Sequence, residues 1–388
     1  MSRILSFEIT GLAGRNEPLR RELNSGVNIF WGKNGCGKTS MLKILHSALL
    51  DDAAFLARVP FTTAKVHIET PLGRLERRIW NPEVGEPRED EDNPFIDEEW
   101  QEYRARERLL RQADQLHWST TPSNIRMPRG VRHSYLSTLR LSDTPRVRQG
   151  ISSSEVLDEA AFDRLFARQI RIIWQDYYTR ELMQIRRAQQ KGLAAIATSV
   201  MLGSSKKRRK TPSIEIGEFD AEAAYGAVRE FFDAQEFELR LTYGEFVENF
   251  ETSTLMREVV AEVIDVQRGI EAAQEPTAAL QELVKDLFSG GKHLEFEGRT
   301  LHVKQGSTEI PLWALSSGEK QVIRLLIECL AAGGNPVLID EPELSMHVDW
   351  QHRLVECMRL LNPRAQLILA THSPEIMADV TDEEIMEL

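Results

Sequence analysis

The segment Gly32–Thr39, which has the sequence GKNGCGKT, most constrains the fold, because it matches G-x-x-x-x-G-K-[ST] at every fixed position. An apolar strand pattern precedes it at Val27–Trp31, and apolar residues at helical spacing follow it over Ser40–Leu50. Glycines at such a junction let backbone N–H groups point inward, and a helix start adds partial positive charge. The segment therefore predicts a phosphate-binding loop between a strand and a helix.

Loops with this pattern hold a nucleoside triphosphate such as ATP together with Mg²⁺. We expect Lys38 to reach the β- and γ-phosphates and the Thr39 hydroxyl to bind the metal ion. A chance match in a glycine-rich turn is the alternative, which the strand and helix on either side disfavour. The residues predicted to contact the nucleotide are Gly32, Asn34, Gly35, Gly37, Lys38, Thr39 and Ser40.

A second pattern, VLIDEP at Val337–Pro342, is an apolar strand that ends in two acids. A buried strand would deliver Asp340 to the edge of a sheet, where a carboxylate can hold Mg²⁺. Glu341 then points to the other side of the strand, which suits a general base for an attacking water molecule. Two acids at a strand–loop junction are also common without a catalytic role, so this pattern alone leaves both interpretations open.

A third pattern, LSSGEKQ at Leu315–Gln321, begins an apolar helix. The start of that helix would offer Ser316, Ser317 and Gly318 to an anion. Ser316 and Glu319 also have the spacing of a capping box, in which two residues satisfy each other's backbone N–H groups. Both interpretations can hold together.

A fourth pattern, LILATHSP at Leu367–Pro374, is another apolar strand that ends in polar residues. His372 would be placed to contact a γ-phosphate or the attacking water. A single histidine after a strand is more often structural. The order and spacing of all four patterns favour the functional interpretation.

Helix and strand patterns alternate from Glu319 to Ala370, which predicts a parallel sheet. We expect an N-terminal lobe over 1–150, a mostly helical insertion over 151–290 and a C-terminal lobe over 291–388. Helical runs of about 45 residues in the insertion would span at most roughly 65 Å if unbroken, and Gly269 and Pro276 predict breaks. An apolar stripe there is either core or a partner surface; it comprises Phe162, Leu165, Phe166, Ile170, Ile173, Trp174 and Tyr177.

The composition narrows the functional classes. No apolar run of about 18 residues and no secretory leader is visible, and three cysteines form neither a metal spacing nor a disulfide framework. We therefore expect a cytoplasmic protein with no membrane contact. The net charge of −12 disfavours a surface that grips nucleic acid everywhere, but the basic run Lys206–Lys210 is either a solvated loop or a local contact to DNA.

The four patterns in this order resemble the nucleotide-binding head of ABC-type ATPases, in the soluble RecF, SMC and OLD branch. The resemblance covers residues 1–80 and 290–388. It implies a central, mostly parallel sheet flanked by helices, with a compact helical insertion. It also implies that two heads dimerise face to face around two ATP molecules, so that the loop of one copy faces Ser316, Ser317 and Gly318 of the other. Asp340 would then coordinate Mg²⁺, Glu341 would be the catalytic base, and His372 the switch histidine.

This sequence departs from the family pattern in three places. The usual LSGGQ has become LSSGE, and His347 stands where transporters carry an aspartate after the acidic strand. A glutamine that contacts Mg²⁺ in the family has no counterpart in the segment Tyr135–Arg140, which we expect to occupy its neighbourhood. The metal contacts from that side remain open.

Only 16 residues follow His372, whereas OLD-type proteins carry a nuclease domain after the ATPase. The chain is thus similar to the ATPase subunits of two-component anti-phage systems such as Septu and PARIS. We expect an ATPase whose head-to-head dimer, or a higher oligomer, controls a separately encoded nuclease or toxin. The alternatives are a RecF-like repair ATPase that clamps DNA and an ATP switch without hydrolysis, which the intact Glu341 disfavours.

Overall fold

The computed structural model describes residues 1–81, 115–122, 130–137, 159–202, 220–234, 238 and 240–388. The chain forms two compact units, of which the first comprises Met1–Trp174 and Leu280–Leu388 and the second Gln175–Ala279. The second unit falls inside the predicted insertion, whose boundaries stay a prediction. The basic run Lys206–Lys210 lies outside the described residues. No helix in the described part is both long and apolar enough to cross a membrane.

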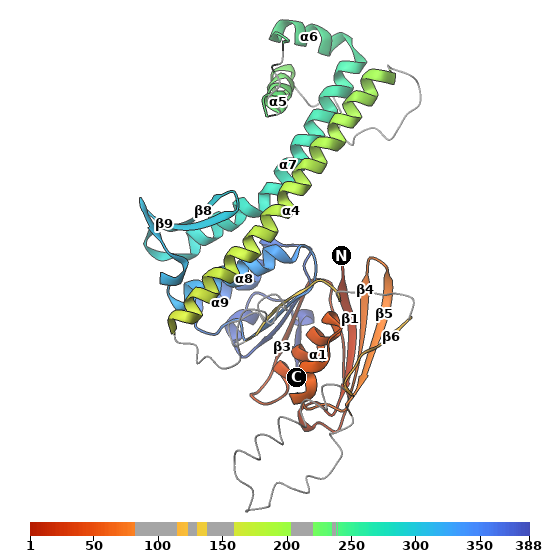
Figure 1. Cartoon of the computed structure of the whole chain (residues 1–388), viewed down its shortest axis with the longest axis vertical. Coiled ribbons are helices and arrows are strands. Elements are labelled where there is room, and N and C mark those ends of the chain that lie inside the picture. The colour runs from red at the N-terminus through yellow and green to blue at the C-terminus, as the bar shows by residue number, and fades with distance from the viewer. Residues whose placement is uncertain (82–114, 123–129, 138–158, 203–219, 235–237, 239) are drawn as a thin grey trace, which may run out of the picture. The chain divides into compact units, whose positions relative to one another are not determined.

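A five-stranded sheet, in which all neighbouring strands are parallel, forms the centre of the first unit (Figure 1). The inner strands β11 and β12 are buried because helices cover both faces: α1 (Lys38–Leu50) contacts β11 and β12 on one side, and α8 (Ser317–Ala332) contacts β11 on the other. The predicted parallel sheet is therefore confirmed. In sheet order the strands are β13 (Ile385–Glu387), β3 (Val27–Trp31), β12 (Leu367–Thr371), β11 (Val337–Asp340) and β7 (Ser134–Leu136).

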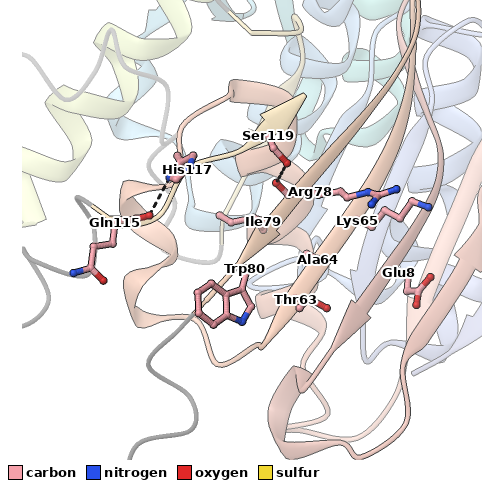
Figure 2. Close-up of a pocket in the computed structure, with 10 residues that line it drawn as sticks. All are labelled: Glu8, Thr63, Ala64, Lys65, Arg78, Ile79, Trp80, Gln115, His117 and Ser119. Carbon is pink, nitrogen blue, oxygen red and sulfur yellow. Dashed lines mark hydrogen bonds between the residues drawn. The ribbon is translucent and has the colours of Figure 1, made fainter. Parts of the chain in front are cut away.

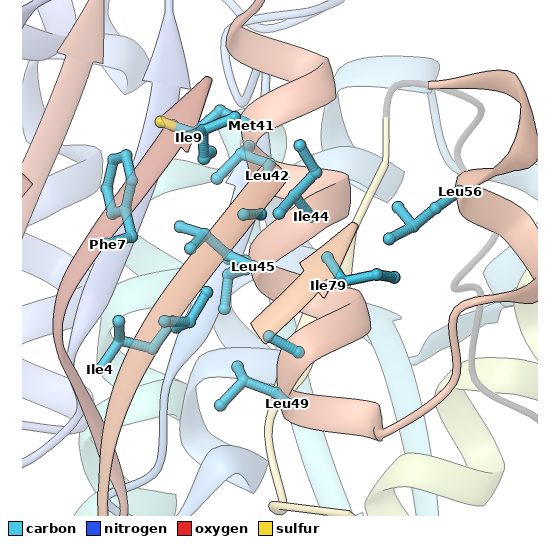
Figure 3. Close-up of a cluster of buried hydrophobic side chains, with 14 of the residues drawn as sticks. Ile4, Phe7, Ile9, Met41, Leu42, Ile44, Leu45, Leu49, Leu56 and Ile79 are labelled. Atoms are coloured by element: carbon cyan, nitrogen blue, oxygen red, sulfur yellow. The ribbon is translucent and has the colours of Figure 1, made fainter. Parts of the chain in front are cut away.

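A second sheet in this unit is antiparallel, and its strands alternate between buried and solvent-facing residues. The helix α1 (Lys38–Leu50) lies between the two sheets, so that its side chains pack on both. Figure 3 shows Leu42, Leu45 and Leu49 of α1 directed toward Ile4 and Phe7. In order the strands are β2 (Leu19–Glu22), β1 (Arg3–Thr10), β4 (Thr63–Thr70), β5 (Gly73–Trp80) and β6 (Ser119–Thr121).

A third, small antiparallel sheet comprises β8 (Lys292–Glu297), β9 (Thr300–Gln305) and β10 (Thr308–Ile310). Trp174 stacks on Phe296 at 4.0 Å between ring centroids and donates a hydrogen bond to the Gly298 carbonyl. Most of the predicted apolar stripe is thus core rather than a partner surface, although Phe162 is 42% exposed. The other helices of this unit are α8 (Ser317–Ala332), α9 (Val348–Leu361), α10 (Pro374–Met377), η1 (Leu12–Gly14), η2 (Ala54–Arg58), η5 (Ser289–Gly291), η6 (Leu312–Ala314) and η7 (Asp382–Glu384).

The second unit contains parts of two long helices, α4 (Glu159–Leu202) and α7 (Thr254–Leu287), which pair in antiparallel orientation. The orientation follows from the contacts, because Tyr177 meets Thr277 near one end while Gly192 meets Val266 further along. The shorter α5 (Ala221–Asp233) and α6 (Tyr243–Thr252) complete a core of their own with α7 and part of α4.

The predicted breaks at Gly269 and Pro276 are wrong, since α7 continues through both residues. Contacts within the helix pair explain the continuity. The Thr277 hydroxyl lies 3.3 Å from the Tyr177 hydroxyl and donates to Glu181 at 3.2 Å, which holds the turn that contains the proline. A Cβ on Gly269 would lie 3.4 Å from the Cβ of Ala188, so the small residue suits a close helix approach. Tertiary packing here outweighs local helix propensity.

We predict that Gly192→Ala destabilises the protein, although alanine is the better helix former by about 1 kcal/mol. A Cβ at this position would lie 1.9 Å from Cγ2 of Val266, and such overpacking costs about 1–3 kcal/mol. The midpoint of thermal unfolding measures the effect. Gly226→Ala in α5 is the matched control, because its new methyl group would meet no atom within 4 Å and should not lower the midpoint. A raised midpoint for both variants would contradict the close contact.

Candidate nucleotide site

The phosphate loop connects the end of β3 to the start of α1, as the sequence predicts. Gly35 and Gly37 have φ angles of 80° and 101°, in the left-handed region that side chains disfavour. A Cβ on Gly37 would lie 3.0 Å from Leu12 Cγ, so the loop also packs closely against η1. Glycine is required at this position both by backbone conformation and by space.

Lys38 is the buried cation of the loop, with 5% of its surface exposed. Its ammonium group donates hydrogen bonds to the carbonyls of Gly32 at 2.8 Å and Lys33 at 3.2 Å. The chain's own carbonyls therefore hold the charge inside the loop, where the predicted phosphates would bind. Of the other predicted contacts, Asn34 and Gly35 are exposed, while Thr39 and Ser40 are half-buried at the start of α1.

Asp340 ends β11 and is only 3% exposed. Burial raises the pKa of its carboxyl to about 6, and the charge of Glu341 adds to this, while the Thr39 hydroxyl and the ammonium groups of Lys43 and Lys38 oppose it. Neither carboxylate oxygen forms a hydrogen bond of ordinary geometry with the described residues. A buried carboxylate with open acceptors fits a divalent cation, with Thr39 as its neighbour.

No group of three or more histidine, cysteine or carboxylate ligands gathers anywhere in the described part of the chain. A magnesium ion at Asp340 would thus have few protein ligands and would complete its shell with phosphate oxygens and water, which is the usual arrangement for Mg²⁺. The donor set fits magnesium bound together with a nucleotide rather than a preformed metal cage.

His372 lies between Lys38 and Glu341. Its Nδ1 is 3.5 Å from Nζ of Lys38, and its Nε2 is 3.9 Å from Oε1 of Glu341. Because an ammonium group only donates, Nδ1 is the acceptor, so the neutral imidazole carries its proton on Nε2, facing Glu341. Both side chains are about one-third exposed, at 32% and 33%, so water reaches the space between them.

Sequence reasoning missed two residues of this cluster. The carboxylate of Glu343 accepts a hydrogen bond from the backbone N–H of His372 at 2.7 Å. No sequence pattern predicts this hydrogen bond, because an acidic residue in a turn after a strand is common. Lys43 acts on the pKa of Asp340, and it follows Thr39 by four residues on the same helix face, a spacing that could have indicated it.

The start of α8 forms the predicted capping box. Ser316 accepts a hydrogen bond from the backbone of Glu319, whose side chain accepts one from the backbone of Ser316. The Glu319 carboxylate is buried, yet an ion pair with Lys292 at 2.7 Å and the Ser316 N–H keep its pKa below the usual value. Ser316 and Ser317 are exposed, while Gly318 is buried where a Cβ would lie 2.8 Å from the Ser345 carbonyl.

The structure therefore brings the predicted residues together in two groups. Lys38, Asp340, Glu341 and His372 meet at the carboxyl-terminal edge of the parallel sheet. Among the hydrogen bonds and ion pairs that the structure describes, none joins Ser316, Ser317 or Gly318 to the phosphate loop. Within one chain, the predicted signature residues are not part of the loop's own cluster.

The expected neighbourhood of the missing glutamine agrees with the sheet order. β7 pairs with β11, with Leu136 opposite Ile339, so the next residue of each strand reaches the same edge of the sheet. No glutamine occurs over 130–137, and residues 138–140 lie outside the described part.

A cavity of about 720 Å³ lies on the antiparallel sheet, away from the phosphate loop (Figure 2). Figure 2 shows Trp80 and Arg78 of β5 among its lining, with Lys65 from β4. None of the predicted nucleotide-binding residues lines it. The candidate site is therefore defined by the convergence of charged groups at the sheet edge rather than by this cavity.

We predict that Asp340→Asn stabilises the nucleotide-free, magnesium-free protein at pH 8. The folded-state pKa of about 6 exceeds the ordinary 3.8, so folding favours the protonated form and stability falls as pH rises through this window. A shift of this size corresponds to about 2–3 kcal/mol, which the amide would recover above pH 6 and not below pH 4. The free energy of unfolding against pH tests this, with the exposed Asp349→Asn as control. A variant less stable than wild type at pH 8 would show that the carboxylate has a partner.

Comparisons with known proteins match part of the chain to a family of AAA domains and to a probable ATPase. Residues 203–378 match a family described as AAA domain, putative AbiEii toxin, Type IV TA system. The chain is also 35% identical over 124 residues to the Retron Vc95 probable ATPase of Vibrio cholerae serotype O1 biovar El Tor. That alignment covers 27% of this chain and 24% of the relative, so the chain matches about a quarter of the relative's length.

Solved structures similar to the chain include SMC heads. The Smc head domain of Pyrococcus furiosus with an extended coiled coil, bound to the C-terminal domain of ScpA, has 13% identity and a TM-score of 0.42, with 97% of this chain and 92% of that chain covered. The SMC head domain of Thermotoga maritima has 10% identity and a TM-score of 0.38, with 99% and 94% covered. Likenesses at these scores support no argument about this chain.

The assignment instead depends on the chain's own residues and the partial sequence matches. A glycine-bent loop with a buried lysine leads into α1, and acidic and histidine side chains from the neighbouring strands meet it. The matched region 203–378 carries the other three motifs of the sequence. Together these residues form a candidate ATP site of the P-loop type.

Proposed function

We propose that two copies of the chain bind ATP with Mg²⁺ between them and hydrolyse it at a composite site. The observation that carries this proposal is that the predicted nucleotide-binding residues form two separate groups within one chain. Lys38, Asp340 and His372 gather around the loop, whereas Ser316 and Ser317 are exposed at a helix start with no link to it. An exposed helix start binds anions, so a second copy can supply it to the phosphates held by the first.

Lys38 would hold the β- and γ-phosphates by exchanging its hydrogen bonds to loop carbonyls for bonds to phosphate oxygens. Thr39 and Asp340 would hold Mg²⁺, which supplies charge neutralisation on the phosphate oxygens when bound. A cation beside Asp340 would favour the ionised form of its carboxyl, which burial disfavours. Lys38, Thr39 and Asp340 would thus bind and orient the nucleotide and its metal ion. The proton transfer would be carried out by Glu341 and His372.

Glu341 would accept a proton from the attacking water, because its carboxylate is partly open to solvent beside His372. The positive φ of 50° at Glu341 is unusual for a residue with a side chain and sets the carboxylate's direction after the strand ends. His372, with its proton on Nε2, can donate a hydrogen bond to that water or to the γ-phosphate. Its position between Lys38 and Glu341 joins phosphate binding to water activation.

We predict that Glu341→Gln binds ATP but hydrolyses it about 10²- to 10⁴-fold more slowly, the usual contribution of a general base. The variant should also accumulate ATP-bound dimers, which size-exclusion chromatography with light scattering detects. Lys38→Ala is the matched comparison, because it should lose ATP binding itself, together with dimer formation. Normal turnover by Glu341→Gln would show that the base lies elsewhere, and unchanged nucleotide affinity of Lys38→Ala would remove the loop assignment.

The ATP-dependent dimer would control a separately encoded effector, a nuclease or toxin, in anti-phage defence. The names of the matched family and relative support this step, since one refers to a putative toxin and a toxin–antitoxin type and the other to a retron. The relative is matched over only 24% of its length, so its partners are not transferred by the alignment. The second candidate is a RecF-like ATPase that clamps DNA, which the basic run Lys206–Lys210 favours.

Co-purification distinguishes these candidates. We predict that tagged Glu341→Gln, expressed with its neighbouring genes and ATP, brings down a second protein with nuclease or toxin sequence in a fixed ratio. Tagged Lys38→Ala is the control, and it should lose a partner that binds the ATP-bound dimer. Recovery of DNA without a second protein would instead favour the clamp. Replacing Lys206–Lys210 with neutral residues should then release the DNA.

A further inference from the structure

Glu343 stands at the junction of two segments of the site, the turn after β11 and the residues after β12. The turn is closed by hydrogen bonds from Leu344 N–H to the Glu341 carbonyl at 3.2 Å and from Met346 N–H to the Glu343 carbonyl at 3.0 Å. From within this turn, Oε1 of Glu343 accepts the backbone N–H of His372 at 2.7 Å. Its Oε2 is buried with no hydrogen-bond partner among the described residues. Among the described residues, the carboxylate of Glu343 therefore makes one hydrogen bond, in which Oε1 accepts the backbone N–H of His372.

The same two segments are tied at a second point. The Ser373 hydroxyl lies 2.7 Å from Oε1 of Gln351 and 2.7 Å from Oε2 of Glu375, and Nε2 of Gln351 donates to the Met346 carbonyl at 2.9 Å. β11 and β12 are neighbours in the sheet, with Asp340 opposite Ala370. One further backbone hydrogen bond, from the Glu341 N–H to the Ala370 carbonyl at 2.8 Å, continues this pairing, and side chains hold together the residues beyond it.

The far end of the turn touches the start of α8. Ser345 has a φ of 64°, and its carbonyl lies 2.8 Å from the position of a Cβ on Gly318. A turn that carries Glu341 at one end thus contacts the predicted signature at the other.

We propose that Glu343 is a positioning residue for ATP hydrolysis, which holds His372 between Lys38 and Glu341 by accepting its backbone N–H. This inference rests on the proposed function of the site. The imidazole meets Lys38 at 3.5 Å and Glu341 at 3.9 Å, so a small shift of its backbone removes both approaches. The contact needs an acceptor at this distance, so a neutral acceptor on a side chain of the same length should keep His372 in place.

Substitutions of Glu343 distinguish the effect of its side-chain length on turnover from the effect of its charge. Glu343→Gln keeps an acceptor at the same distance and should retain most of the turnover rate. Glu343→Ala removes the acceptor and Glu343→Asp withdraws it by one methylene group, so both should lower kcat about 10- to 100-fold, the scale of a misplaced catalytic group. The KM for ATP should change only a few-fold, because Lys38 and the loop are untouched. Asp349→Ala is the control and should behave as wild type, because Asp349 is an exposed acid in the first turn of α9, the helix between β11 and β12.

A double-substitution cycle with His372→Ala tests whether Glu343 acts through His372. If it does, Glu343→Ala should lower kcat little further in the His372→Ala background, since the group it positions is already gone. Losses that multiply would overturn the proposal, as would a Glu343→Gln variant as slow as Glu343→Ala. Thermal unfolding of each variant identifies a folding defect, and Glu343→Asp against Glu343→Gln keeps the test decisive if Glu343→Ala does not fold.

The outcome is distinguishable from failure of the proposed function. An inactive wild-type protein, or a Glu341→Gln variant with normal turnover, would contradict the site assignment itself. Slow hydrolysis by Glu341→Gln together with wild-type kcat for Glu343→Ala and Glu343→Asp would contradict only the positioning role.

Discussion

The buried ammonium of Lys38, held by carbonyls of a glycine-bent loop, is the constraint on which the rest of the site depends. A charge with this little exposure needs close polar partners, and the loop provides them only because Gly35 and Gly37 adopt left-handed conformations. The loop is fixed in turn by α1, whose apolar side chains fill the space between the two sheets. Parallel order then places the end of β12 beside the end of β3 and the end of β11 next to β12, and so brings His372 and Asp340 toward the lysine.

The sequence was sufficient for elements whose local pattern and tertiary role agree. The loop, the apolar strands that end at Asp340 and Thr371, and the capping box at Ser316 and Glu319 all formed as predicted, because burial on both faces of the sheet leaves a clear apolar run. The strands β7 and β13 were missed because three residues carry too little pattern. The predicted break at Pro276 failed for a different reason: contacts across the helix pair, which no local pattern encodes, stabilise the turn around it.

The candidate site likewise combines residues that sequence motifs predict with residues that only the fold brings together. The roles of Lys38 and Asp340 are predicted from motifs, whereas Glu343 depends on a contact between segments that are 29 residues apart. A hydrogen bond of this kind is fixed by the fold and leaves no spacing rule in the sequence. The exposed Ser316 and Ser317 present the converse case: their type was predicted, but within one chain nothing described connects them to the loop. A site completed by a second copy gives these residues a role at the phosphates.

The central claim is that each ATP site takes its loop from one copy and its helix start from the other. Mixing two separately inactive variants tests it most directly: Lys38→Ala, which disables the loop, and Ser317→Arg, which fills the exposed start of α8 without touching the core. In a mixed dimer, one of the two sites would combine the intact loop with the intact helix start. The account predicts that the mixture hydrolyses ATP although neither variant does alone. Full activity of Ser317→Arg by itself, or an inactive mixture that still forms mixed dimers, would contradict it.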